Sequence, residues 1–167
     1  MKSTEQTGFG LLDALIGVGI LAAGVLVLLA AVNRAQANAR ELRETQIANL
    51  LLHDLAERLH LNQHLSKAAV ATLYSHTLGA SLPADIDCSA SPCDATALAQ
   101  HDMHTWGQAV ATQLPEGQFA LVSGADVVTV MLSWQPRGNI ATPGLDTGLD
   151  QLVCPTDRRC LLTHIRP

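Results

Sequence analysis

Hydrophobic residues are concentrated near the start of the chain. From Ala14 to Val32 the sequence contains no charged residue (ALIGVGILAAGVLVLLAAV). Residues 9–12 are also uncharged, so Asp13 is the one interruption in the run. Because an α-helix rises about 1.5 Å per residue, the run from Ala14 to Val32 approaches the ~30 Å thickness of the bilayer hydrocarbon. The pattern predicts a membrane-spanning helix.

The helical pattern continues after this run. Neither proline nor glycine occurs between Ala31 and Leu78, so we expect one helix from Phe9 to near Leu61. The residues predicted to face the rest of the protein recur at helical spacing: Leu42, Asn49, Leu52, Leu55, Ala56 and Leu59. Four charged residues are expected on its other faces: Arg40, Glu44, Asp54 and Arg58.

A second helix is predicted in the middle of the chain. Asp94 is a typical N-cap for a helix from Ala95 to about Leu114, which Pro115 and Gly117 would end. Ser66–Leu73 would add a further helical turn or two. The apolar face of the second helix is predicted to comprise Leu98, Trp106, Val110 and Leu114.

The last third of the chain has the pattern of a small β-sheet. Gln118–Ser123 and Val127–Gln135 are predicted strands, and the three residues between them suit an antiparallel hairpin. Pro136–Gly148 is a predicted loop, and Gln151–Cys154 and Cys160–Arg166 are candidate short strands. Alternation in the second strand predicts one buried face, formed by Val128, Val130, Leu132 and Trp134. The expected fold is α+β, with an antiparallel sheet packed on the long helix.

Composition narrows the function classes. The chain has 167 residues, of which 48% are hydrophobic, 15% charged and only 3% aromatic, with a net charge of −5. This apolar content argues against intrinsic disorder, and no second run is long enough for another membrane span. The acidic balance disfavours an electrostatic nucleic-acid binder. Trp106 and Trp134 both lie on the apolar faces of predicted elements, so we expect them to pack in the core rather than stack on a ligand.

No pattern of catalytic residues is present. The sequence has no HExxH motif, no glycine-rich phosphate loop and no nucleophile elbow, so we expect neither an enzyme nor a cofactor. Histidines at helical spacing lack a clear third ligand, so we interpret them as solvated surface residues and predict no metal site. These pairs are His60 with His64 and His101 with His104.

The start of the apolar helix resembles the class III signal of type IV prepilins. The matching residues are Gly8-Phe9-Gly10-Leu11-Leu12-Asp13. The resemblance implies that a dedicated peptidase removes the leader Met1–Gly8 on the cytoplasmic side and that Phe9 is then N-methylated. The family usually has Glu where this chain has Asp13, and that carboxylate is expected to pair with the free amine of a neighbouring subunit. A hydrated position of Asp13 at the membrane interface is the alternative.

Further residues resemble the PilV subgroup of minor pilins, the type IV pilus modification proteins. The segment Asp54-Leu55-Ala56-Glu57-Arg58 is similar to a stretch of that subgroup. The later Cys-x4-Cys pair, the helix with Trp106 and the strand ending Ser133-Trp134-Gln135 are similar too. Glu57 and Arg58 are interpreted as a solvated helix face, with a contact to a neighbouring pilin as the alternative.

The resemblance implies a type IV pilin fold and an assembly role. Residues 1–8 would be the leader, residues 9–32 the transmembrane or filament-core half of the long helix, and residues 33–167 the periplasmic head. The protein would sit in the bacterial inner membrane with a cytoplasmic N-terminus, and later in a pilus filament or its tip. Its expected partners are the prepilin peptidase/N-methyltransferase, other minor and major pilins, and the inner membrane.

Four cysteines fall in two close pairs, and all follow the membrane segment. In a periplasmic head they would persist as disulfides. Four cysteines allow three connectivities; we predict Cys88–Cys93 and Cys154–Cys160, because both loops are short and each contains a proline. A zinc site is the competing interpretation, but the pair spacing and the compartment are unfavourable for it.

Other functions share some of these features. Type II secretion pseudopilins and DNA-uptake pilins carry the same N-terminal signal. The head of a pilin can also act as an adhesin at the filament tip, for which the loops Pro136–Gly148 and Cys154–Cys160 are the candidate surfaces. A cleaved secretory signal or a periplasmic enzyme on an uncleaved anchor would account for the apolar run alone, although the run is longer than a typical signal peptide requires.

Overall fold

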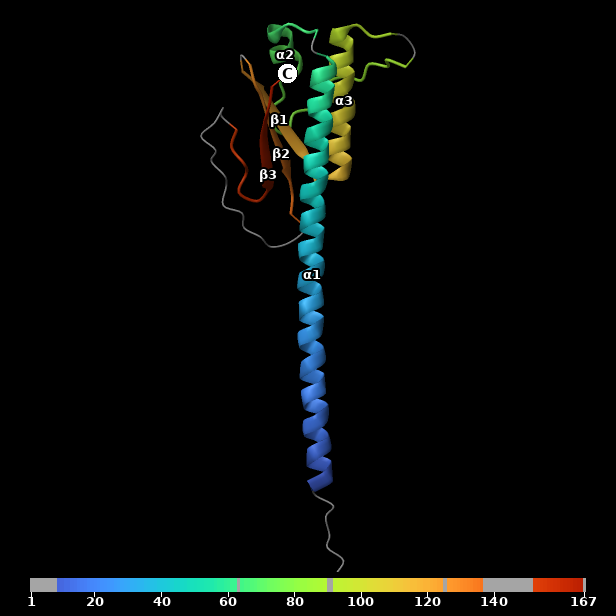
Figure 1. Cartoon of the computed structure of the whole chain (residues 1–167), viewed down its shortest axis with the longest axis vertical. Coiled ribbons are helices and arrows are strands. Elements are labelled where there is room, and N and C mark those ends of the chain that lie inside the picture. The colour runs from blue at the N-terminus through green and yellow to red at the C-terminus, as the bar shows by residue number, and fades with distance from the viewer. Residues whose placement is uncertain (1–8, 63, 90–91, 125, 137–151, 167) are drawn as a thin grey trace, which may run out of the picture. The chain divides into compact units, whose positions relative to one another are not determined.

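The computed structural model describes residues 9–62, 64–89, 92–124, 126–136 and 152–166. Within them the helices and strands (Figure 1) are α1 (Phe9–Leu61), α2 (Lys67–Leu73), α3 (Ala95–Gln113), β1 (Gln118–Ser123), β2 (Val128–Trp134) and β3 (Arg159–Ile165). The α+β layout expected from the sequence is present, with a long N-terminal helix and a small antiparallel sheet. The predicted leader and residues 137–148 of the predicted loop lie outside the described residues.

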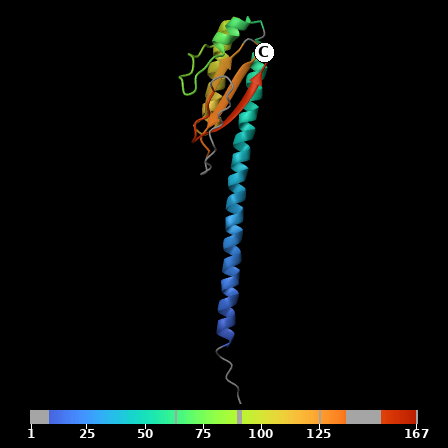
Figure 2. The same ribbon diagram turned by 90° about the vertical axis from the view of Figure 1, so that its left-hand side faces the viewer.

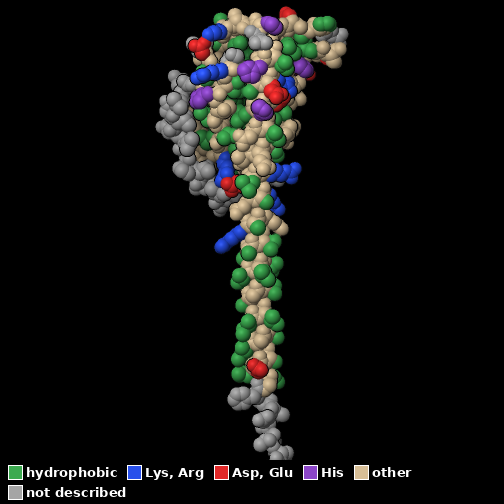
Figure 3. All heavy atoms as spheres, in the orientation of Figure 1, with side chains coloured by type: hydrophobic (Ala, Val, Ile, Leu, Met, Phe, Trp, Pro, Cys, Tyr) green, Lys and Arg blue, Asp and Glu red, His purple; other side chains and the backbone are tan. Residues whose placement is uncertain are grey.

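Helix α1 contributes to two compact units of the chain, Met1–Arg40 and Glu41–Pro167. In the first unit every α1 residue from Gly10 to Arg40 is exposed, and Figure 3 shows hydrophobic side chains along this part of the helix. By its length and composition, α1 is long and apolar enough to cross a membrane. Exposure of so many apolar side chains to water would be unfavourable.

In the second unit α1 buries one face. The buried apolar residues follow the expected helical spacing: Ala48, Leu51, Leu52, Leu55 and Leu59. The predicted face was wrong at its beginning, because Leu42 and Asn49 are exposed and Glu44 is buried. Residues 42 and 49 lie on a neighbouring face of the helix. The buried face is formed by residues 44, 48, 51, 55 and 59. That face is the part of the helix against which the rest of the unit packs.

Side-chain caps begin α2 and α3. The Ser66 hydroxyl accepts a hydrogen bond from the Ala69 amide at 3.2 Å, and the Asp94 carboxylate accepts one from the Ala97 amide at 2.8 Å. Each cap satisfies an amide that has no partner in the first turn of its helix. The predicted apolar face is confirmed at Trp106, Val110 and Leu114, which are buried, but Leu98 is only half-buried. The buried face of α3 also includes Ala99, Asp102 and Met103.

The three strands form an antiparallel sheet in the order β1-β2-β3. Gln118 pairs with Ser133 in one ladder, and Val128 pairs with Ile165 in the other. Figure 2 shows the sheet face-on, with β3 at one of its edges. The prediction of one buried face for β2 was wrong, because all seven of its residues are buried.

The two faces of β2 belong to different cores. Its even-numbered residues join the larger core, which contains the buried face of α1, α3 and the two tryptophans. On the opposite face, Met131 packs with Ala120 and Leu152 in a smaller cluster. Of the candidate strand Gln151–Cys154, the described residues form only a single bridge position at Val153.

Candidate functional site

The processing residues lie at the beginning of α1. Gly8 is outside the described residues, and α1 begins at Phe9. Asp13 is exposed and is the only charged side chain from Phe9 to Val32. A single carboxylate thus lies within a long, exposed apolar helical surface.

Arg58 connects α1 to α3, so the expectation of a fully solvated position was wrong. Its Nε donates to Asp54 Oδ2 at 3.0 Å within α1. Its Nη1 donates to Asp102 Oδ1 at 2.9 Å and to the Thr105 hydroxyl at 3.0 Å on α3. Only Glu57 matches the predicted solvated face, with a side chain that is 69% exposed. Arg58 therefore joins α1 to α3 within the second unit.

The carboxylate of Asp102 is nearly buried in this network, with 12% of its side chain exposed. Burial raises the pKa of Asp102, because desolvation disfavours the charged form, and Arg58 opposes that rise. Nearby, the Asn62 amide donates to the Ala95 carbonyl at 3.0 Å and to the Tyr74 hydroxyl at 3.3 Å. Burial also raises the pKa of Tyr74. These groups form a polar layer between α1, α2 and α3.

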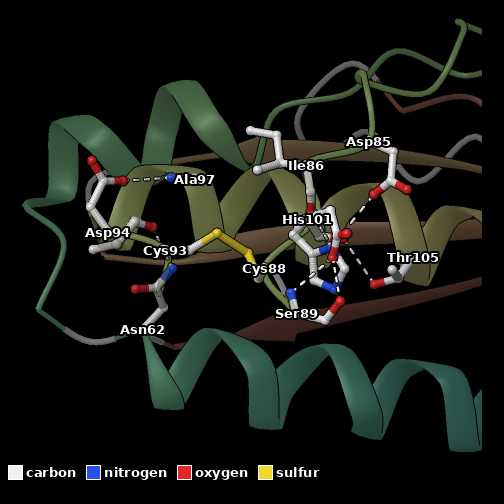
Figure 4. Close-up of a disulfide and its surroundings, with 12 residues drawn as sticks. Asn62, Asp85, Ile86, Cys88, Ser89, Cys93, Asp94, Ala97, His101 and Thr105 are labelled. Atoms are coloured by element: carbon white, nitrogen blue, oxygen red, sulfur yellow. Dashed lines mark hydrogen bonds and ion pairs between the residues drawn. A yellow bond between two sulfur atoms is a disulfide. The ribbon is translucent and has the colours of Figure 1, made fainter. Parts of the chain in front are cut away.

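The disulfide Cys88–Cys93 closes the connection between α2 and α3 (Figure 4), and it is one of the two predicted pairs. The neighbouring segment is held by histidines of α3. The Nδ1 of His101 lies 2.7 Å from the Ile86 carbonyl, and the Nδ1 of His104 lies 2.8 Å from the Pro83 carbonyl. The interpretation of His101 and His104 as solvated was therefore wrong: both are half-buried and fasten a loop to the helix.

The second disulfide joins Cys154 to Cys160, as predicted, and its loop carries a buried arginine. Arg158 Nε donates to the Ser133 hydroxyl at 2.7 Å, and its Nη2 donates to the carbonyls of Ser133 and Glu116. The disulfide loop is thereby fixed to β2 and to the turn before β1. Sequence reasoning did not identify this contact; the arginine pair 158–159 inside the cysteine loop was the only available signal.

The next residue, Arg159, forms an ion pair with α1. Its Nη1 lies 2.5 Å from Glu41 Oε1. Arg159 is the cross-strand partner of Trp134, and both Trp134 Nε1 and Arg159 Nε are buried without a hydrogen-bond partner among the described residues. Trp106, in contrast, donates from Nε1 to the Leu51 carbonyl at 2.7 Å. Both tryptophans are buried, which confirms the prediction that they pack in the core.

The described residues contain no cluster of three or more histidine, cysteine or acidic side chains that could hold a metal ion. One groove of about 570 Å³ lies over the smaller cluster, near Leu78, Met131 and Leu152. Another, of about 490 Å³, lies between α1 and β3. The structure thus presents an exposed apolar helix and surface grooves. Comparisons with protein-family models, curated proteins and solved structures found no match to this chain.

Proposed function

We propose that this chain is a PilV-like minor pilin that takes part in the assembly or initiation of a type IV pilus. In this proposal a prepilin peptidase cuts after Gly8, and the new N-terminal Phe9 is N-methylated. The precursor resides in the inner membrane with its head in the periplasm, and the mature protein then enters the filament or its tip. The assignment to a type IV pilus rests on the sequence resemblance. The exposed apolar part of α1 and the single carboxylate of Asp13 support it on physical grounds.

The observation that carries the proposal is the exposure of α1 from Gly10 to Arg40. A helix with exposed apolar side chains on every side is stable only in lipid or among similar helices. Lipid tails are about as apolar as leucine, so exchanging lipid for neighbouring helices has little hydrophobic cost. Gly17, Gly19 and Gly24 face open space and would let another helix approach closely. A pilin helix uses both environments in turn.

Asp13 distinguishes assembly from simple anchoring. A carboxylate in the hydrocarbon is unfavourable by about 2.5–3.5 kcal/mol at the centre of the membrane and by less near its surface. In a bundle of helices without water, Asp13 requires a cationic partner. The free amine at the N-terminus of a neighbouring processed subunit would provide one, because cleavage after Gly8 creates that amine close to residue 13 of the sequence.

The mature N-terminus provides the direct test. We expect mass spectrometry of the protein purified from its native host to find an N-terminal N-methyl-phenylalanine at residue 9. In Gly8→Ala we expect the full precursor to accumulate, with Met1 or its processed form at the N-terminus. An unprocessed wild-type protein, or normal processing of Gly8→Ala, would refute the assignment.

A second experiment tests the role of Asp13. We expect Asp13→Ala to insert into the membrane normally but to be depleted from sheared pili and to reduce piliation. Asp13→Glu restores the residue usual in the family and serves as the matched control, so it should retain assembly. Wild-type piliation by Asp13→Ala would remove the proposed charge pairing. Normal processing without any effect on pili, but with loss of secretion or DNA uptake, would instead indicate the pseudopilin or uptake-pilin alternative.

A further inference from the structure

One edge of the sheet is not paired with a further strand in the described part of the chain. At the β1 edge, His76 forms a bridge with Leu121 through two backbone hydrogen bonds, of 3.1 and 2.8 Å. At the opposite edge, β3 pairs only with β2 among the described residues. The β2–β3 ladder runs without a bulge from Arg159 to Ile165, and β3 contains no proline. Bulges and prolines are common devices that prevent an edge strand from pairing with another chain.

A groove runs along this open edge. It has a volume of about 490 Å³ and lies between β3 and one face of α1. On the β3 side it is lined by the consecutive residues 161–166, and on the α1 side by residues at helical spacing from Asn49 to His60. An extended segment placed beside β3 would lie about 4.8 Å from it, with alternate side chains directed to the two faces of the sheet. The groove therefore has the position that strand addition requires.

The charge in the groove differs from that of the whole chain. The chain carries 15 acidic against 10 basic residues. The groove, in contrast, is lined by His53, His60, His164 and Arg166 and by no carboxylate. Figure 3 shows histidine and basic side chains, with some acidic ones among them, on one face of the second unit. These side chains are hydrogen-bond donors or cations, which match an acidic occupant.

Charged groups from neighbouring elements also face this region. On α1, the Glu57 carboxylate lies 4.0 Å from His53 Nε2, and the Asp54 carboxylate forms an ion pair with Arg58. From β2, the hydroxyl of Thr129 lies 3.1 Å from His164 Nδ1. Asp126, in the connection before β2, interacts electrostatically with Arg166 and forms an ion pair with Lys67. Each of these carboxylates already has a basic partner on the protein.

From these observations we infer that the edge of β3 is a docking site for an extended, carboxylate-bearing segment of another protein, which adds to the sheet as a fourth strand. Backbone hydrogen bonds to β3 would supply affinity, and acidic side chains of the segment would contact the histidines and Arg166. A second copy of β3 is a poorer occupant. Two copies joined at this edge would bring together two grooves lined by histidines and Arg166 with no carboxylate, so their charges would not be complementary. The inference concerns the head alone and does not depend on the proposed pilin function.

The test uses the full, isotopically labelled chain in detergent micelles. The probe is a synthetic eight-residue peptide of alternating threonine and glutamate, and its matched control has glutamine in place of glutamate. We expect saturable binding of the glutamate peptide, with chemical-shift changes and slowed amide exchange along β3. The glutamine peptide should bind at least tenfold more weakly.

Two variants separate docking in the groove from general attraction. Arg166→Gln should weaken binding of the glutamate peptide three- to tenfold and reduce the salt dependence of the binding that remains. Arg43→Gln removes an exposed arginine of α1 outside the groove and should leave the affinity unchanged. The inference is overturned by equal binding of the two peptides, by equal effects of the two variants, or by binding that leaves β3 amide exchange unchanged. Self-association through β3 that the glutamate peptide cannot displace would overturn it in favour of a second copy.

Discussion

Replacing Arg58 with methionine should destabilise the second unit more than removal of any exposed charge on α1. Methionine keeps much of the length of the side chain but removes its three hydrogen bonds. The bond to Asp102 dominates the expected loss, since the carboxylate of Asp102 is 12% exposed while that of Asp54 is 45% exposed. The variant leaves Asp102 nearly buried without its cationic partner.

The magnitude follows from these exposures. A hydrogen bond to a charged group contributes about 1.5–3 kcal/mol when it is buried, whereas an exposed pair at i, i+4 contributes only about 0.3–0.5 kcal/mol. Stranding a buried charge typically costs about 3–5 kcal/mol. Because Asp102 retains slight exposure, we expect a loss near the lower limit, about 3 kcal/mol of unfolding free energy at neutral pH. Asp102→Asn should cost only about 1 kcal/mol, since its amide oxygen still accepts from Arg58.

The loss should depend on pH in a definite direction. Burial raises the pKa of Asp102, and the Arg58 guanidinium opposes that rise. Without Arg58, the folded-state pKa lies further above the unfolded value of 3.8. The folded variant then binds a proton more tightly than its unfolded chain, so its unfolding free energy rises as pH falls from neutral toward the unfolded pKa. The stability difference from the wild type should therefore shrink on acidification.

The assay is denaturant unfolding of the full chain in detergent, followed by tryptophan fluorescence. Both tryptophans of the chain are buried in the second unit, so the signal reports on the head. Glu57→Gln is the matched control, because it removes an exposed neighbouring charge and should change stability by no more than about 0.5 kcal/mol. Adding Asp102→Leu to Arg58→Met should recover at least half of the loss, since no charge is then stranded. A loss below 1 kcal/mol, a pH-independent loss, or no recovery in the double variant would refute the reasoning.

Three further predictions concern the same unit and use the same unfolding assay. Gly117→Ala should cost about 2–3 kcal/mol, because the new Cβ would lie 2.2 Å from a backbone oxygen of α3, whereas Gly124→Ala, with its nearest contact at 3.4 Å, should be tolerated. Trp106→Phe should cost about 2–4 kcal/mol, since it removes a buried hydrogen bond to α1 and leaves a cavity, and a loss below 1 kcal/mol would contradict the packing described. Cys154→Ser should lower the free energy of unfolding by about 2 kcal/mol, because the loop that this disulfide closes is short. Reduction of the wild type breaks both disulfides and should lower it by at least as much.

Local patterns predicted the elements well because their causes are local. The absence of proline and glycine after Ala31 predicted that α1 is continuous, and its end at Leu61 was anticipated. Asp94 is the N-cap of α3, and a short connection after Ser123 joins an antiparallel hairpin, with four residues where three were predicted. Caps, breaks and tight connections depend on residues close together in the sequence, so the sequence contains the necessary information.

Errors arose where a partner lies far away in the sequence. Arg58 was predicted to be solvated because nothing nearby indicated that Asp102, 44 residues later, would lie beside it. One face of β2 was predicted to be exposed. That prediction failed because Leu152, which lies far along the sequence and just before the last strand, packs against that face. Arg158 is buried because a disulfide loop folds onto β2, again over a long separation. Helical and strand periodicity identify elements, but they do not identify which element covers which face.

The distribution of polar contacts fits a protein that changes surroundings without refolding. The second unit is held by Arg58 and Arg158, by two disulfides and by capped helices, all within the unit. The described part of the first unit offers apolar side chains with Asp13 as its one charge before Arg34. Apolar contacts are non-directional, so under the proposed function this part of α1 can exchange lipid for other helices while the second unit keeps its own bonds. Asp13 would then be the one charged side chain of the segment that loses water in the exchange, which is why its substitution tests assembly rather than membrane insertion.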